Sequence, residues 1–210
     1  DIGLGIPAEP LFRSSIPTKD VCSGAWFDKT MYIVTEYTRS NQRFIIPEYN
    51  NYPCPKCEDG CLNPFDYCKR ILKHEGGDSE WCEIPRHQCN NPDCEFVSRM
   101  LPPEFVPYKH YGSREITDVL SDVISPYDEK VEYPCTLTME LWLLWLEVNI
   151  TYMESMMRSI ANRRLGFADT ILQSERSIID YMKKCPDYDN IWLTTVLRCI
   201  YNAGGTLQAV

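Results

Sequence analysis

Two closely spaced pairs of cysteines constrain this chain more than any other feature of its sequence. The first pair is Cys54 and Cys57, and the second is Cys89 and Cys94, with a proline between the members of each pair. A tight turn can present two thiolates on one side, and two such turns supply the tetrahedral coordination that zinc takes in structural sites. The sequence therefore predicts zinc as a cofactor held by these four thiolates, with no position left for a substrate.

Other uses of the cysteines stay open. A disulfide framework of a secreted protein predicts an even number of cysteines, whereas this chain has 11. A redox CxxC motif needs a thioredoxin-like βαβ context, which the residues around the first pair lack. A further group lies between the two pairs and either forms a second metal site or fills apolar space, as free cysteines commonly do. No second tight pair is present, which favours apolar filling: Cys61, Cys68 and Cys82, with His74 and His87 nearby.

Composition describes an ordinary foldable protein with an acidic balance. Of its 210 residues 44% are hydrophobic and 24% are charged, and the net charge is −9. Strong non-specific binding to nucleic acid depends on an excess of Lys and Arg, so this charge argues against it. The longest apolar run, Leu141 to Leu146, is far shorter than the roughly 18 residues of a membrane span. With no signal peptide in view, we expect a cytoplasmic protein with no membrane partner.

The first half of the chain reads as an N-terminal arm over residues 1–51 and a cysteine-rich module over residues 52–111. The arm is rich in Pro and Gly at its start. The module contains a Glu-Gly-Gly-Asp sequence whose glycines suit the positive φ of a hairpin turn. We expect two short strands in the arm and two hairpin strands in the module, at residues 31–37, 43–46, 67–74 and 80–88.

From residue 112 to 210 the apolar residues follow a helical period. Four helices are predicted, at residues 113–124, 136–164, 168–184 and 190–201. Trp142 or Trp145, together with Trp192, should be buried between them. The predicted fold class is α+β: a small β-rich zinc ribbon, followed by an all-α helical bundle with a helix-turn-helix-like start.

Two neighbouring segments carry a resemblance to a known kind of module. They are Ile84–Cys94, IPRHQCNNPDC, and Met100–Tyr111, MLPPEFVPYKHY. They resemble the N-terminal modules of bacterial insertion-sequence transposases and an uncharacterised family of short relatives. There a zinc ribbon ends in a cysteine pair, and an LPxxxxPYxxY connector and a helix-turn-helix follow. The resemblance covers about residues 43–147 and implies a DNA-binding module, with the helix near residues 136–147 in the recognition position.

The helix at residues 136–147 contains no Lys or Arg, although Arg is the residue that most often contacts base edges and phosphates in complexes with DNA. We therefore expect the contacts with DNA to come from the ribbon and the connector. The function expected is a DNA-binding or transposition-associated protein without its own nuclease domain. The alternative is a zinc-stabilised protein-protein interaction module that does not bind DNA. An enzyme is not expected, because the chain shows no Ser-His-Asp order, phosphate loop or HExxH motif. The predicted nucleic-acid-binding residues are Lys69, Arg70, Lys109 and Arg114.

Overall fold

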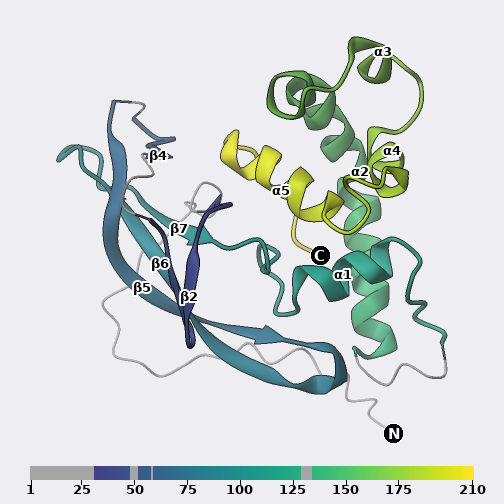
Figure 1. Ribbon diagram of the computed structural model, residues 1–210, viewed down its shortest axis with the longest axis horizontal. Helices are drawn as coiled ribbons and strands as arrows, with labels where there is room; N and C mark the ends of the chain where they lie inside the picture. The colour runs from purple at the N-terminus through teal and green to yellow at the C-terminus, as the bar shows by residue number, and fades with distance from the viewer. Residues whose placement is uncertain (1–30, 48–51, 58, 129–133) are drawn as a thin grey trace, which may run out of the picture.

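Strands form the first part of the protein and helices the second (Figure 1). The computed structural model describes residues 31–47, 52–57, 59–128 and 134–210, so the first 30 residues of the expected arm lie outside the described part. The strands are β1 (Met31–Ile33), β2 (Thr38–Ser40), β3 (Arg43–Ile45), β4 (Tyr52–Pro53), β5 (Cys61–Lys73), β6 (Ser79–Cys89) and β7 (Val97–Leu101). The helices are α1 (Ser113–Leu120), α2 (Thr136–Leu165), α3 (Asp169–Leu172), α4 (Ile178–Lys184) and α5 (Trp192–Asn202).

A long antiparallel hairpin of β5 and β6 is the spine of the sheet. Its register runs from Lys73 opposite Ser79 to Leu62 opposite Cys89. The turn contains Gly76, whose φ of 81° is a conformation that glycine adopts without strain. The expected hairpin is thus confirmed, and both of its strands extend beyond the bounds that the sequence suggested.

Short strands from the N-terminal part of the chain complete the sheet. Strand β6 pairs in parallel with β3 at one end and antiparallel with β7 at the other, and β1 adds to β7 in parallel. Among the described residues these pairings give one seven-stranded sheet, which curls in Figure 1. Its path is β1-β7-β6-β3-β2, with β5 and then β4 on the other edge of β6.

The predicted fold class is wrong in its first half. We expected a small zinc ribbon and found a large curled sheet in a mixed α/β protein, although helices do follow it. The reason is that strands from the expected arm join the cysteine-rich module through parallel pairings, which carry no signal in local spacing. The helices do pack on one another, with α2 in contact with α1, α3, α4 and α5, but they do not form a unit separate from the sheet. The helices and the sheet share one core cluster, which contains Phe44 and Ile84 of the sheet together with Met139 and Trp192 of the helices.

The tryptophans predicted to be buried are buried. Trp142 and Trp145 lie on the inner side of α2, and Trp192 begins α5 with no exposed surface. The ring of Trp142 packs edge-on against Tyr111 at 5.0 Å between centroids, so the start of α2 is fixed to the segment that leaves the sheet. Helix α2 ends at Gly166, whose left-handed conformation is the usual helix C-terminal cap.

The side chain of Asn202, the last residue of α5, completes the edge of the sheet. Its Nδ2 donates to the carbonyl oxygen of Ile33 at 2.8 Å, and its Oδ1 accepts from the N–H of Ile33 at 2.8 Å. The amide therefore satisfies both backbone groups of Ile33 in strand β1, as a neighbouring strand would.

Candidate metal centre

The first cysteine pair lies in a turn between β4 and β5. The N–H of Cys54 donates to the carbonyl oxygen of Gly60 at 2.8 Å, which closes the turn around Cys57. Gly60 has no room for a side chain, since a Cβ there would lie 2.4 Å from the Sγ of Cys89. The absence of a side chain at this position is what lets the two turns approach each other.

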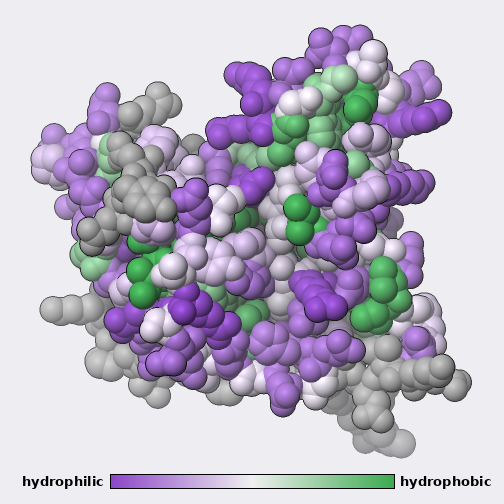
Figure 2. Space-filling model, viewed as in Figure 1, coloured by the Kyte–Doolittle hydropathy of each residue, from purple (hydrophilic) through white to green (hydrophobic). Residues whose placement is uncertain are grey.

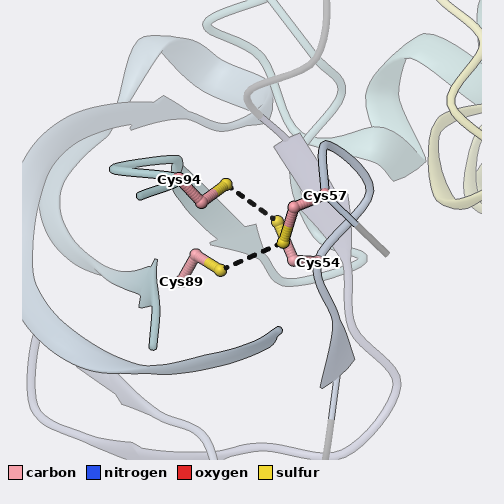
Figure 3. Close-up of side chains that lie close together, drawn as sticks. All are labelled: Cys54, Cys57, Cys89 and Cys94. Carbon is pink, nitrogen blue, oxygen red and sulfur yellow. Dashed lines mark hydrogen bonds between the residues drawn. The ribbon is translucent and has the colours of Figure 1, made fainter. Parts of the chain in front are cut away.

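The second pair begins at the end of β6. The N–H of Cys89 donates to the carbonyl oxygen of Phe96 at 2.8 Å, and the N–H of Cys94 donates to that of Asn91 at 3.0 Å. These two hydrogen bonds fold residues 89–96 back on themselves. Both thiols of the pair consequently point toward the first turn (Figure 3).

The four sulfur atoms lie at the corners of a compact cluster (Figure 3). The Sγ atoms of Cys54 and Cys94 are 3.7 Å apart, those of Cys57 and Cys89 are 3.6 Å apart, and all four lie within 4.8 Å of one another. A tetrahedral metal bound by sulfur at about 2.3 Å places its ligands about 3.8 Å apart. The four thiols are free rather than joined in disulfides. The cluster therefore has the size and the donors to hold a metal ion.

Hydrogen bonds and burial act in opposite directions on these thiols. Burial opposes the ionisation of Cys57, but backbone N–H groups of Gly60 and Asp59 and the thiol of Cys89 lower its pKa to about 7. At Cys89 burial prevails and raises the pKa to about 12. Four thiolates crowded together repel one another, and a bound cation is the ordinary means of compensating them. Lys56 adds a positive charge at the rim, where its Nζ donates to the carbonyl oxygen of Cys94 at 3.1 Å.

The remaining cysteines of the module do not build a second site. In the described part of the chain, no other group of three or more His, Cys, Asp or Glu side chains could hold a metal ion. Cys82 is buried in the main core, where burial raises the pKa of its thiol to about 11, and Cys68 packs against the same core. His87 is buried against Leu62, and His74 lies beside Glu80. Of the two interpretations, a second metal site or the filling of apolar space, the second therefore holds for Cys68 and Cys82.

The four residues predicted to bind nucleic acid do not share one surface. Lys69 is exposed on β5, whereas Arg70 turns inward and donates to the carbonyl oxygens of Val106 and Lys109 at 2.6 and 2.7 Å. The Nζ of Lys109 lies 5.4 Å from the centre of a Trp145 ring. Arg114 lies on α1, where it lines a separate pocket with Asp118. Lys69 and Arg70 line one pocket, whereas the Lys109 side chain lies against Trp145 and Arg114 lies apart.

The sequence reasoning missed two features of the sheet surface. One is the pair of exposed aromatic side chains Tyr67 and Trp81, and the other is Arg99 on β7. The period-two alternation along β5 and β6 could have revealed the first, because Tyr67 and Lys69 are two residues apart and share a face. The second had no local signal, since Arg99 acquires its neighbours only through the pairing of β7 with β6.

The fold and the site define a mixed α/β protein with a four-cysteine centre that could hold a metal ion. Residues 54–142, which include both cysteine pairs, match the model of a family described as a domain of unknown function (DUF6431). No curated protein and no solved structure matches the chain. Within the described residues, no helix combines the length and the apolar character that crossing a membrane requires.

Proposed function

We propose that this is a zinc-stabilised DNA-binding protein in which the outer face of the sheet contacts a single strand of DNA. Zinc is the metal that best fits four cysteine ligands and no oxygen donors, and such a closed site is structural. Its ligands Cys54, Cys57, Cys89 and Cys94 tie the start of β5 to the end of β6. The bound metal would thereby fix one end of the sheet that carries the proposed surface.

The observation that carries the proposal is the interleaving of aromatic rings and cations on this outer face. Tyr67 and Trp81 are 41% and 56% exposed. Lys69 and Arg43 both align with Glu83 in the strand register, so they lie on the same face as the rings. The guanidinium of Arg43 stacks over Tyr67 at 4.6 Å. Rings that stack on bases, with cations beside them for phosphates, are the usual means of holding single-stranded nucleic acid.

Charge on this face is only partly compensated. Glu83 accepts a hydrogen bond from Nε of Arg43 at 2.6 Å. Lys69 forms no ion pair with any described carboxylate, which leaves its ammonium group to meet a phosphate. The side of the molecule drawn in Figure 2 is largely hydrophilic, with separate hydrophobic patches.

The resemblance to transposase-type modules supports DNA as the partner, but the contact we propose differs from a recognition helix. The first four turns of α2 contain no Lys or Arg, and their inner side is buried through Met139, Trp142 and Trp145. A helix that reads the major groove needs donors for base edges and phosphates. The sheet offers such donors and α2 does not.

The test is fluorescence anisotropy with labelled single-stranded and duplex DNA at low salt. Loss of one stacking ring costs about 1–3 kcal/mol, so Trp81→Ala should weaken single-strand binding about tenfold or more. Lys69→Ala should reduce the slope of log affinity against log salt by about 0.7. Tyr127→Ala is the matched control, because this ring is 77% exposed and precedes α2 on the helical side.

The DNA-binding proposal fails if the wild type shows no binding below about 100 μM at low salt, the weak end of ordinary non-specific affinity. If Trp81→Ala and Tyr127→Ala bind equally well, the surface has been assigned to the wrong face.

A second candidate function is protein interaction through α2. Leu137, Leu144 and Val148 are 51%, 43% and 46% exposed, and their spacing places them on one side of the helix. Such a stripe is typical of helices that pair with another helix. A dimer seen by sedimentation equilibrium that Leu144→Glu dissociates, together with an absence of DNA binding, would favour this function.

A further inference from the structure

A small basic pocket lies on the inner side of the sheet, where β5 and β7 meet the segment that leads to α1. Its volume is about 250 Å³, and apolar side chains of β1, β6 and β7 form its floor. Its polar lining contains several cations and no carboxylate. The polar lining residues are Lys69, Arg70, Arg99, Tyr108 and His110.

Arg70 is held in this pocket by one nitrogen of its guanidinium, while the other two have no hydrogen-bond acceptor among the described residues. Its Nη2 donates to two backbone carbonyls, those of Val106 and Lys109, and its ring neighbour is Phe105 at 5.3 Å. No described residue accepts a hydrogen bond from its Nε or Nη1. Burial, together with the like charge of Arg99, lowers the pKa of Arg70 to about 10. The guanidinium nevertheless stays positive at neutral pH, held rigidly and without a carboxylate.

Arg99 has no carboxylate partner among the described residues either. It stands directly opposite Arg86 in the ladder between β6 and β7. The nearby Asp66 is already engaged by Arg86, whose Nε donates to its Oδ1 at 2.6 Å. Like charges directly opposite each other destabilise a sheet. The pocket therefore concentrates positive charge that the fold itself does not neutralise.

The backbone is strained at Tyr108, one of the residues that line this pocket. Tyr108 has a φ of 62°, a conformation that costs a non-glycine residue about 1–3 kcal/mol and that clusters at ligand sites. This conformation places Tyr108 at the pocket beside His110, so that a hydroxyl and an imidazole lie next to the two arginines. Two guanidinium groups, with a hydroxyl and an imidazole beside them, form a set suited to an oxyanion.

We propose that this pocket binds a phosphate group. The guanidinium of Arg70, held in a fixed position, would donate hydrogen bonds to the phosphate oxygens, and the side chains of Arg99 and Lys69 would supply further positive charge. The ligand is either a free phosphate or diphosphate anion or the terminal phosphate of an oligonucleotide, and the chemistry recognised is the same. Lys69 borders both this site and the outer face of the sheet. Arg70 lies on the opposite face of β5 from Lys69, so the inference does not rest on the outer face binding DNA.

The experiment is calorimetric titration of the zinc-loaded protein with inorganic phosphate and pyrophosphate, with ionic strength held constant by chloride. The wild type should bind pyrophosphate more tightly than phosphate, because the second phosphoryl group adds charge. Arg99→Gln should weaken the binding of both anions at least tenfold. It should not lower the free energy of unfolding, because it removes a pair of like charges. Arg70→Lys retains the charge and loses the fork, so it should also weaken binding. Arg163→Gln, an exposed arginine in the last turn of α2, is the matched control and should leave both affinities unchanged.

A second arm separates the two sources of the phosphate. A 5′-phosphorylated oligonucleotide that binds tighter than its unphosphorylated twin, with the difference abolished by Arg99→Gln, identifies a nucleic acid end. Equal binding of the two oligonucleotides, with pyrophosphate still bound, identifies a free anion. Trp81→Ala should leave pyrophosphate binding intact, so that loss of the outer face and loss of this pocket are distinguishable. The proposal is overturned if the wild type binds neither anion more tightly than about 10 mM, or if Arg99→Gln binds them as the wild type does.

Discussion

The described residues form two hydrophobic cores, and the two differ in the side chains that make them. The larger core joins the sheet to the helices and consists of apolar side chains such as Ile84, Met153 and Trp192. The smaller one lies at the end of the sheet, and three of its buried members are cysteines of the metal centre. Its apolar part is a handful of side chains: Val34, Ile46, Leu62 and Met100.

The difference between the cores follows from the area that each can remove from water. Apolar burial contributes roughly 25 cal/mol per Å², so a large core is stable on packing alone and a very small one is not. In the smaller core a metal would replace missing apolar area with metal-sulfur bonds. The two cores should therefore fail independently, one on loss of metal and the other on loss of packing.

Removing the metal ligands should give the largest effect. Cys89→Ser takes one thiolate from the cluster, and structural zinc sites supply ~10 kcal/mol or more to small modules. We expect about one zinc per chain in the wild type and none in the variant. Amide exchange should become fast at residues 52–57 and 89–96 while α2 and α5 remain protected. Metal analysis and hydrogen exchange are the measurements, with the exposed Cys135→Ser as control.

Two results would contradict the proposed metal site or the independence of the two cores. Stoichiometric zinc in Cys89→Ser would mean that the metal lies elsewhere. Cooperative loss of the helices upon chelation of the wild type would mean that the two cores unfold as one unit.

A cavity in the larger core should have the next largest effect. Trp192 is fully buried, and its Nε1 donates to the Oγ of Ser121 at 2.9 Å. Trp192→Ala should lower the free energy of unfolding by ~3–5 kcal/mol, measured by urea denaturation. Zinc content under native conditions should stay unchanged. The exposed Trp81→Ala is the control and should change the free energy of unfolding by no more than about 0.5 kcal/mol. Release of zinc from Trp192→Ala below its unfolding transition would contradict the independence of the cores.

The smallest effect should come from crowding the metal centre without touching a ligand. A Cβ at Gly60 would lie 2.4 Å from the Sγ of Cys89, so Gly60→Ala must displace that sulfur. We expect zinc affinity to fall by ~10–100-fold, the range for changes next to metal ligands. Competition with a chromogenic chelator measures this. Gly76→Ala in the hairpin turn has open space around it and a φ of 81°. It should cost the hairpin about 1 kcal/mol and leave zinc affinity unchanged. Equal affinities for the two variants would show that the cluster adapts to a displaced sulfur.

Features encoded within a few neighbouring residues could be predicted from the sequence. The cysteine pairs reveal the metal centre because each turn holds both of its ligands, and the glycines of the hairpin turn reveal the pairing of β5 with β6. The burial of Trp192 followed from helical periodicity, since α5 has a polar side at Thr194 and Arg198. Trp142 and Trp145 lie on one stripe of α2, although the other side of this helix is also apolar, with Leu144 and Val148 exposed.

Features that depend on distant segments could not be predicted. The parallel pairings of β1 with β7 and of β3 with β6 join strands separated by many residues, and nothing in the spacing of either strand specifies its partner. The same limit explains Arg70, which we expected on a DNA-facing surface. Its position on β5 turns it inward, and it becomes fixed only because the segment around Val106 folds back over it.

The hydrogen bonds between Asn202 and Ile33 have a consequence for how the chain is made. Strand β1 is at the edge of the sheet, and an open edge can pair with an edge of another molecule. Ribosomal synthesis delivers β1 long before α5, so the edge stays uncovered while more than a hundred further residues emerge. The newly made protein thus passes through a stage in which the strands are present but Asn202, which covers the edge of β1, has not yet been synthesised. Chaperone dependence and aggregation during expression should respond to Asn202 more than the stability of the finished protein does.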